Sequence, residues 1–255
     1  MLNPHGERIG MSIKTHIGLG DAIQFTSVPE NFYRTFGKRL VDVSGSWVLK
    51  YNPFVDRGIE LPPGHITEMW DYQRPQPKPP ERPLCYLSMA ERHAWVFKAK
   101  VFTKYPRLYI YEDFPLHKRE KIFIQIQGKS HGRLPDHVID HVLKKYKGFP
   151  LIQLDTKDVE DIGLPRVYTP DVWDLVKEIS ECKMLIGPDS GPSWIAACYP
   201  DVICKKVRMS PTPEHFQNWL PLEIQNIHSH WDDRFALICN PTEDDIGFTA
   251  SYRRI

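Results

Sequence analysis

Short apolar runs alternate with amphipathic stretches along the second half of the chain. Residues 121–126 form an apolar run typical of a buried strand, and the apolar residues of 134–146 recur at the spacing of one helix face. Three further apolar runs, at 150–154, 183–186 and 201–207, are predicted to be strands. Strands that alternate with helices in this way predict a doubly wound parallel sheet.

The helix between the strands at 150–154 and 183–186 has a recognisable start. Thr169 is a favourable N-cap residue, Pro170 suits the first helical position, and Asp171 is favourable in the first turn. The apolar stripe of this helix comprises Val172, Leu175, Val176 and Ile179. A shorter helix is predicted at 193–199.

The first half of the chain begins with a similar unit. Residues 8–14 are predicted to be a strand, 22–36 a helix and 39–43 a second strand. Pro29 has no N–H to donate, so we expect it at a boundary or a kink of that helix. A strand, a glycine-containing loop, a helix and a strand in this order begin a βαβ unit.

The rest of the first half is less periodic. Residues 52–83 are predicted to be loop, with a proline-rich segment at 74–83 that favours an extended connection. Residues 84–111 mix aromatic and aliphatic side chains, and their pattern leaves both helix and strand open.

Length and composition are those of an ordinary globular protein. The 255 residues are 41% hydrophobic and 25% charged, which allows one large domain or two smaller ones and excludes disorder. We place a boundary in the polar segment 113–120, which gives domains of residues 1–115 and 116–255. The net charge of +1 excludes a whole-protein field that gathers nucleic acid, although local basic patches remain. No apolar run is long enough to span a membrane, and no secretory leader is expected.

The loop after the first predicted strand is the first candidate site. Gly18 and Gly20 allow a ligand to approach the main chain, and His16 lies in the same loop. Asp21 is expected near a helix N-terminus, at the carboxyl end of the strand, where open α/β sheets bind their ligands. An aspartate that only caps its helix is the alternative. The third glycine of the dinucleotide pattern G-x-G-x-x-G is missing, which disfavours a Rossmann dehydrogenase.

Residues 187–192, Gly-Pro-Asp-Ser-Gly-Pro, form the second candidate site. They follow a predicted strand and open a helix, so main-chain N–H groups and the helix dipole suit a phosphate. Ser190 adds a hydroxyl donor, Gly191 permits close approach, and Asp189 is better suited to capping N–H groups or to binding a sugar hydroxyl. A plain capped turn is the alternative, and the P-loop pattern is absent.

A basic loop follows the strand at 121–126. Lys129 and Arg133, with Ser130 between them, place two cations where they can neutralise a diphosphate. A solvated basic loop is the alternative.

The glycine–aspartate loop and the Asp-Ser-Gly-Pro loop together resemble glycosyltransferase family 9, the family of the ADP-heptose lipopolysaccharide heptosyltransferases. The element at 189–192, which precedes the alanine-rich segment Ile195-Ala196-Ala197, is the more specific of the two. The resemblance covers residues 9–207, with close agreement only at the motifs. It implies a B-type glycosyltransferase, in which two Rossmann-like domains face a central cleft.

This resemblance also implies roles for individual residues. Asp21 takes the place of the family's catalytic base, and Lys129 takes the place of a basic residue that meets phosphate. The N-terminal domain is expected to bind the acceptor and the C-terminal domain the nucleotide sugar. The residues implied on the donor side are Lys129, Ser130, Arg133, Asp189, Ser190, Gly191 and Pro192, and those on the acceptor side are His16, Gly18 and Gly20.

The chain departs from the family pattern in three places. Trp194 stands where family members usually carry histidine, the chain is shorter than typical members, and the tail after Met209 has little to match. These departures leave the donor sugar and the acceptor open.

The candidate residues suit a sugar transfer without a metal. A carboxylate takes the acceptor proton as the new bond forms, and cations or main-chain donors stabilise the leaving diphosphate. One base and direct displacement predict inversion at the anomeric carbon. There is no Asp-x-Asp motif, since Asp232-Asp233 and Asp244-Asp245 are adjacent pairs typical of solvated turns. We expect no metal and no cofactor, with a nucleotide diphosphate sugar as co-substrate.

Three functions stay open on the sequence. The leading one is an inverting hexosyl- or heptosyltransferase that acts on a glycan or glycolipid. In the second, the acceptor is a modified DNA base or a protein. The third, of another class, is a non-catalytic protein that binds a nucleotide sugar.

Histidine and cysteine signals are weaker. His137 and His141 share a helix face, and His228 and His230 lie near Asp232, but neither group has the further ligands that a metal site needs. The five cysteines are scattered without a C-x-x-C pair, so we expect reduced thiols in a cytoplasmic protein.

Overall fold

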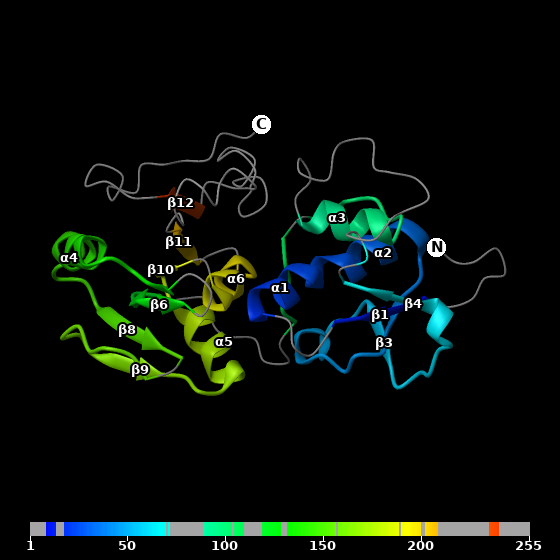
Figure 1. The fold of residues 1–255 in the computed structure, drawn as a ribbon, viewed down its shortest axis with the longest axis horizontal. Coiled ribbons are helices and arrows are strands. Elements are labelled where there is room, and N and C mark those ends of the chain that lie inside the picture. Colours follow the sequence, from blue (N-terminus) through cyan, green and yellow to red (C-terminus); the bar gives the residue numbers. More distant parts are fainter. Residues whose placement is uncertain are drawn as a thin grey trace. The chain divides into compact units, whose positions relative to one another are not determined.

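The chain folds into two α/β units (Figure 1). The computed structural model describes residues 9–13, 18–69, 71, 89–103, 105–109, 119–128, 132–156, 158–188, 190–199, 202–208 and 235–239. The first unit is Met1–Glu112 and the second is Asp113–Ile255, and each is described by itself. The principal sheet of each unit is parallel, so the predicted α/β class is confirmed.

Within its described residues, the first unit contains a four-stranded parallel sheet in the order β3-β2-β1-β4. The strands are β1 (Gly10–Ser12), β2 (Leu40–Asp42), β3 (Val55–Arg57) and β4 (Ile66–Glu68). β3 and β4 fall in the segment 52–83, where the prediction of loop is therefore wrong. β3 and β4 each have a single aliphatic residue, which gives no apolar run, and pairing with neighbouring strands decides their conformation.

After β1 in the sequence, three helical segments follow one another directly from Leu19 to Phe36. They are α1 (Leu19–Gln24), the 3-10 turn η1 (Phe25–Ser27) and α2 (Val28–Phe36). Pro29 lies in the first turn of α2, where its missing N–H has no helical partner to lose, so the expected boundary is confirmed. α2 ends at Gly37, whose φ of 68° provides the left-handed conformation that ends many helices.

Helix α3 (Met89–Val96) lies in the segment that the sequence left open. It packs beside α2, where the rings of Phe32 and Phe97 meet edge to face with centroids 6.3 Å apart. Buried Asn31 ties α2 to the chain after α3, since its Nδ2 donates to Thr103 O at 2.8 Å and its Oδ1 accepts from the N–H groups of Phe102 and Thr103.

Within its described residues, the second unit contains a six-stranded parallel sheet in the order β12-β11-β10-β5-β8-β9. The strands are β5 (Ile122–Ile124), β8 (Leu151–Asp155), β9 (Arg166–Tyr168), β10 (Met184–Pro188), β11 (Ile203–Arg208) and β12 (Phe235–Cys239). In chain order, β8 and β9 are added on one side of β5, and β10, β11 and β12 on the other. This is the strand order of a doubly wound, dinucleotide-binding type of sheet.

Two further strands, β6 (Gln127–Gly128) and β7 (Gly132–Arg133), pair antiparallel after β5. The segment 127–133 is therefore partly a hairpin, where the sequence predicts a polar loop. The prediction also missed β9 and β12. β9 is a three-residue strand, and β12 lies in the tail that the motifs do not reach.

The helices of the second unit are α4 (Asp136–Lys145), α5 (Val172–Glu181) and α6 (Gly191–Ala197). α4 covers one face of the sheet, and α5 and α6 pack together on the other (Figure 1). The N-cap of α5 is Asp171, whose carboxylate accepts from the N–H groups of Trp173 and Asp174. The predicted start at Thr169 is wrong because Thr169 donates instead to Asp155 O and extends the β9 ladder.

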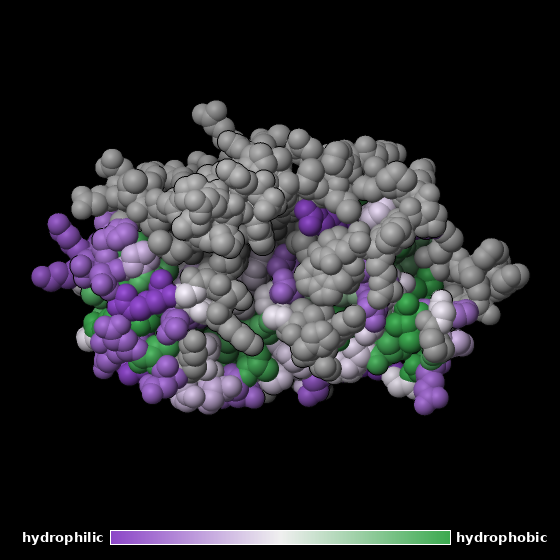
Figure 2. All heavy atoms as spheres, viewed as in Figure 1, coloured by the Kyte–Doolittle hydropathy of each residue, from purple (hydrophilic) through white to green (hydrophobic). Residues whose placement is uncertain are grey.

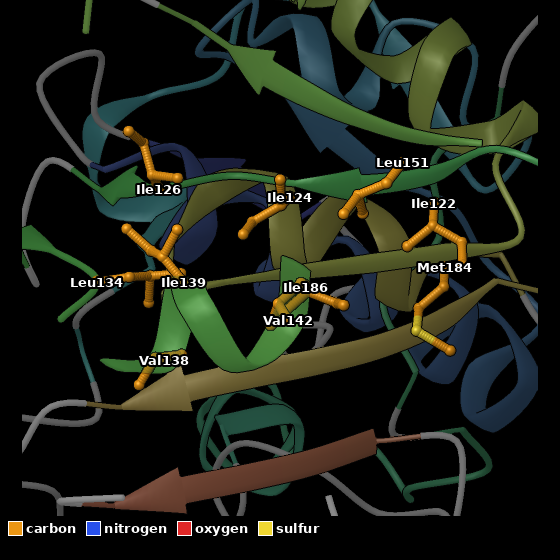
Figure 3. Packing of buried hydrophobic residues seen from close by; sticks show 10 residues of the cluster. All are labelled: Ile122, Ile124, Ile126, Leu134, Val138, Ile139, Val142, Leu151, Met184 and Ile186. Atoms are coloured by element: carbon orange, nitrogen blue, oxygen red, sulfur yellow. The ribbon is translucent and has the colours of Figure 1, made fainter. Parts of the chain in front are cut away.

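The core of the second unit lies between α4 and the sheet (Figure 3). Val138 and Val142 of α4 pack against Ile124 and Ile186 of the sheet. Because successive strand residues point to opposite faces, the fully buried Phe123 faces the α5 and α6 side. The other side of α4 is hydrophilic, as Figure 2 shows, with exposed Asp136, His137, Asp140, Lys144 and Lys145.

Among the described residues, no helix combines the length and apolar character that crossing a bilayer requires. Cys182, Cys198 and Cys204 form no disulfide. Burial raises the pKa of Cys182 to about 12, so this thiol is protonated at neutral pH and is not a nucleophile.

Candidate functional site

Asp21 lies at the switch point of the first sheet. In an open parallel sheet, ligands bind at the carboxyl ends of the two neighbouring strands whose connections run in opposite directions. In the order β3-β2-β1-β4, those strands are β1 and β4. α1 follows β1, and Asp21 is in its first turn, half-buried. The prediction that Asp21 lies near a helix start after the first strand is confirmed.

The main chain at Gly18 makes room for the Asp21 carboxylate. Gly18 is the N-cap residue of α1, and its carbonyl oxygen accepts from the Ala22 N–H at 3.1 Å. A Cβ atom on Gly18 would lie 3.1 Å from Asp21 Oδ2, tighter than ordinary contact. The carboxylate therefore folds back toward the start of its own helix, where a negative charge is favourable. Gly20 is the second residue of α1, and His16 lies outside the described residues.

Ser190 lies at the switch point of the second sheet. There the two neighbouring strands with opposite connections are β5 and β10. The chain after β10 continues into α6, whose N-cap residue is Ser190, and the chain after β5 continues through Gln125 into β6. Gly191 and Pro192 form the first turn of α6. The second candidate loop therefore occupies the place in its own sheet that Asp21 occupies in the first.

Gln125 connects the two strands at this point. It is 3% exposed, and its N–H donates to Ile186 O at 2.8 Å. Its Oε1 accepts from Ser190 Oγ at 2.9 Å, and its Nε2 donates to Gln127 O at 2.9 Å. Sequence reasoning missed this residue, although a glutamine inside the apolar run Ile122–Ile126 is an available signal of a buried polar contact.

Glycines allow the strands and the hairpin to approach closely here. A Cβ on Gly187 would lie 3.0 Å from Gln125 Cβ and 3.1 Å from Gln125 O. A Cβ on Gly128 would lie 3.0 Å from Pro188 Cγ and 3.3 Å from Ser190 Cβ. The switch point of the second sheet is thus closely packed, and its loop is held by neighbours on both sides.

The N–H groups of the loop are partly used within it. The Ser190 N–H donates to Ser193 Oγ at 3.1 Å, and Ser193 Oγ donates to Ser190 O at 2.7 Å. Pro192 has no N–H. A phosphate at this loop therefore finds fewer main-chain donors than the sequence suggests. Trp194, which replaces the family's usual histidine, is 5% exposed within α6.

Arg133 is an ion-paired side chain. Its guanidinium contacts Asp136 at 2.6 Å and Glu160 at 2.8 Å, and these carboxylates raise its pKa further. Both partners are exposed: Asp136 begins α4, and Glu160 lies between β8 and β9. The other predicted donor-side residues, Lys129, Ser130 and Asp189, lie outside the described residues.

Asp155 ends β8, the strand whose terminal carboxylate holds the ribose in many dinucleotide-binding domains. Here the carboxylate is buried and bound by the protein. Arg166 Nη2 lies 2.7 Å from Asp155 Oδ2, and Gln153 Nε2 donates to Asp155 Oδ1 at 3.0 Å. This arrangement agrees with the missing G-x-G-x-x-G pattern in disfavouring a dehydrogenase.

Metal ligands do not gather in the part of the chain that the structure describes, where there is no group of three or more histidine, cysteine, aspartate or glutamate residues. His137 is exposed on α4, as expected, and His141 is half-buried there. Burial, followed by the charges of Lys145 and Lys144, lowers the pKa of His141. His228, His230 and Asp232 lie outside the described residues.

Two parallel α/β units, each with a candidate residue at its own switch point, define a protein built from two Rossmann-like units. Solved structures share this fold. E. coli heptosyltransferase WaaC, crystallised with ADP, is 10% identical with a TM-score of 0.64, covering 96% of this chain and 96% of WaaC. A glycosyltransferase family 9 protein from Veillonella parvula is 13% identical with a TM-score of 0.62, covering 94% of this chain and 87% of that one.

A third structure is the dodecameric, iron-containing glycosyltransferase TibC from enterotoxigenic E. coli. It is 14% identical with a TM-score of 0.60, and the match covers 78% of this chain. The chain spans only 58% of the length of TibC. No protein-family model matches the sequence, and no curated protein matches it. The predicted fold, that of the B-type glycosyltransferases of family 9, is confirmed by these structures.

Proposed function

We propose that the chain is an inverting, heptosyltransferase-like glycosyltransferase that moves a sugar from a nucleotide diphosphate sugar to an acceptor hydroxyl. The observation that carries this proposal is that Asp21 and Ser190 each follow a strand at the switch point of their own sheet. The likeness in fold to WaaC crystallised with ADP supports a nucleoside diphosphate as the leaving group.

Asp21 is the proposed general base. Its carboxylate accepts the proton of the acceptor hydroxyl while the acceptor oxygen bonds to the anomeric carbon. The bond between that carbon and the diphosphate oxygen breaks, and the nucleoside diphosphate leaves with the electron pair. Attack from the side opposite the leaving group inverts the anomeric carbon. Gly18 supports this role, because its missing Cβ leaves space for Asp21 Oδ2.

The donor is proposed to bind along the carboxyl ends of β5 and β10. Asp189, Ser190, Gly191 and Pro192 would contact it, and Lys129 with Ser130 would balance the charge of the diphosphate, without a metal or a cofactor. Asp136 and Glu160 form ion pairs with the Arg133 guanidinium, so Arg133 can bind the diphosphate only if it releases one of these carboxylates.

The acceptor is proposed to bind the first unit beside Asp21, near His16, Gly18 and Gly20. A hydroxyl group of a glycan or glycolipid is the proposed acceptor. A modified DNA base or a protein is the alternative, and the assay below offers the modified DNA. A cytoplasmic location is proposed with it, because Cys182, Cys198 and Cys204 form no disulfide, which suits a reducing compartment.

The test is transfer by the wild type and by Asp21→Asn. ADP-, GDP- and UDP-sugars are offered with lipopolysaccharide core glycan and with hydroxymethylated duplex DNA, in the presence of EDTA, and products are read by mass spectrometry and NMR. We expect Asp21→Asn to lower kcat by about 10²–10⁴-fold while donor binding is retained. Asp56→Asn, an acidic strand residue of the same unit paired with Arg39, is the control with unchanged kcat.

Three results would contradict parts of the proposal. Equal turnover by Asp21→Asn would remove the base, and retention at the anomeric carbon would remove direct displacement. Donor binding by the wild type without transfer to either acceptor would favour the non-catalytic binding protein.

A further inference from the structure

The buried side chain of Gln125 contacts the candidate donor loop through Ser190. We propose that Gln125 is a positioning residue that turns the Ser190 hydroxyl into a hydrogen-bond acceptor for a hydroxyl group of the donor. This proposal rests on the proposed function, because it takes the donor to bind at Ser190.

The orientation of the Gln125 amide follows from its neighbours. One end of the amide lies 2.9 Å from Gln127 O, a carbonyl oxygen that can only accept. The Nε2 group must face this oxygen, because the opposite orientation would bring two acceptors together. Oε1 is then the end that lies 2.9 Å from Ser190 Oγ. Since Oε1 can only accept, the Ser190 hydroxyl must donate its proton to Gln125.

The direction of this proton decides what Ser190 can bind. Its hydrogen is committed to Gln125, and in the capping box of α6 its oxygen also accepts from the Ser193 N–H. Ser190 Oγ therefore presents its remaining lone pair to a ligand. The Ser190 N–H is also committed, because it donates to Ser193 Oγ. A phosphate oxygen, which only accepts, has no donor to meet at this residue, whereas a sugar hydroxyl can donate to Oγ. Turning the Ser190 proton toward a phosphate would leave a buried amide oxygen without a donor.

Gln125 has little freedom to change this arrangement. Its N–H donates to Ile186 O at 2.8 Å, which fixes its main chain against β10. The Cα of Gly187 lies against its side chain so closely that an added Cβ would come within 3.0 Å of Gln125 Cβ. The amide is therefore held before any ligand binds, as a positioning role requires.

A donor hydroxyl has two possible sources, the ribose and the transferred sugar. The binding experiment first identifies which of ADP, GDP and UDP the wild type binds most tightly. It then compares three ligands: this nucleoside diphosphate, the 2′,3′-dideoxy form of the same diphosphate, and the corresponding sugar ester (ADP-heptose, GDP-mannose or UDP-glucose). The dissociation constants are measured by calorimetry for the wild type, Ser190→Ala, Gln125→Met and the double variant.

We expect each single variant to weaken binding about tenfold only for ligands that carry the hydroxyl in question. For a ribose hydroxyl, the diphosphate and the ester lose affinity and the dideoxy form does not. For a hydroxyl of the transferred sugar, only the ester loses affinity. The double variant should lose no more than either single variant, because both substitutions remove one interaction.

Two controls separate a positioning role from a structural one. Ser180→Ala removes another buried serine hydroxyl, which donates to Lys177 O at 2.8 Å, and should leave all three affinities unchanged. Gln125→Glu keeps an acceptor for Ser190 but places a carboxylate oxygen against Gln127 O, so we expect it to weaken all three ligands by a similar factor and to keep their wild-type order of affinities. If Gln125→Met does not fold, as thermal unfolding would show, Ser190→Ala and Gln125→Glu still decide the result.

The outcomes that overturn the inference are specific. Equal losses for all three ligands in Ser190→Ala or Gln125→Met would mean that Ser190 donates to the diphosphate or that these substitutions act only on the structure. If neither single variant loses affinity, or if the losses of affinity add in the double variant, Ser190 and Gln125 do not act through one shared interaction. Failure of the wild type to bind any of the ligands would instead overturn the proposed function, and this inference with it.

Discussion

Acid should destabilise the first unit through His93. This histidine of α3 is fully buried, and its ring meets Phe25 edge to face with centroids 4.8 Å apart. Burial, followed by the charge of Arg92, lowers the pKa of His93 from 6.5 to about 3. In the unfolded chain the imidazole regains its ordinary pKa. Between these two values, the unfolded state therefore binds a proton that the folded state does not.

The magnitude follows from this difference in proton binding. Above pH 7 the imidazole is neutral in both states and contributes no pH dependence. As the pH falls through 6.5 toward 3, the free energy of unfolding decreases by about 1.4 kcal/mol per pH unit from this group. At pH 5.0 the accumulated loss is about 2 kcal/mol, a large part of the stability of a small domain.

Urea denaturation at pH 7.5 and pH 5.0 measures this loss, and hydrogen exchange over residues 89–97 shows whether the unit that contains His93 opens. His93→Gln and His93→Asn should be less stable at pH 7.5 but should lose about 2 kcal/mol less than the wild type on acidification. His137→Gln, at an exposed site on α4, is the control with wild-type pH dependence. Identical acid sensitivity in the wild type and both His93 variants would refute the assignment.

Two predictions concern packing. Gly187→Ala places a Cβ 3.0 Å from Gln125 Cβ, so overpacking should lower the free energy of unfolding by about 1–3 kcal/mol and weaken nucleotide binding. The control is Gly64→Ala, whose added Cβ meets nothing within 4 Å and should change neither property. Equal urea midpoints for the two variants would contradict the prediction. Asn31→Ala removes three hydrogen bonds to Phe102 and Thr103, two of them buried and one part-buried, at a cost of about 3 kcal/mol. A loss below 1 kcal/mol in urea denaturation would show that water replaces them.

Sequence periodicity predicted the helices and strands that contain an apolar run or a regular apolar stripe. β5 and β10 are short apolar runs, and α4 carries a regular stripe that includes Val138 and Val142. β3, β4 and β9 were missed because each has a single aliphatic residue, whereas β5 is Ile-Phe-Ile, and their conformation depends on pairing with neighbouring strands. The start of α5 was misplaced because Thr169 and Asp171 are both good caps, and only the contact of Thr169 with Asp155 decides between them.

The sequence predicted the loops of the candidate site but not the residues that contact and hold those loops. Asp21 and Ser190 were recognisable because glycine and aspartate after an apolar run are typical of a ligand-binding turn. The role of Gln125 depends on the pairing of β5 with β10, which no local pattern contains. For the same reason, the charge of Arg133 was visible in the sequence, but its partners Asp136 and Glu160 were not.

The strand order of the second sheet also determines how long each strand must wait during synthesis for its neighbours in the sheet. β5 leaves the ribosome first among these strands, yet its partner Met184 in β10 follows Ile122 only after roughly 60 more residues, or about 3–12 s of translation at ordinary rates. During that interval β5 can pair only with β8, and the other edge of Ile122-Phe123-Ile124 stays unpaired until β10 is made. The nascent chain therefore exposes an apolar strand edge until β10 has been made, so we expect chaperone supply to aid production of this protein.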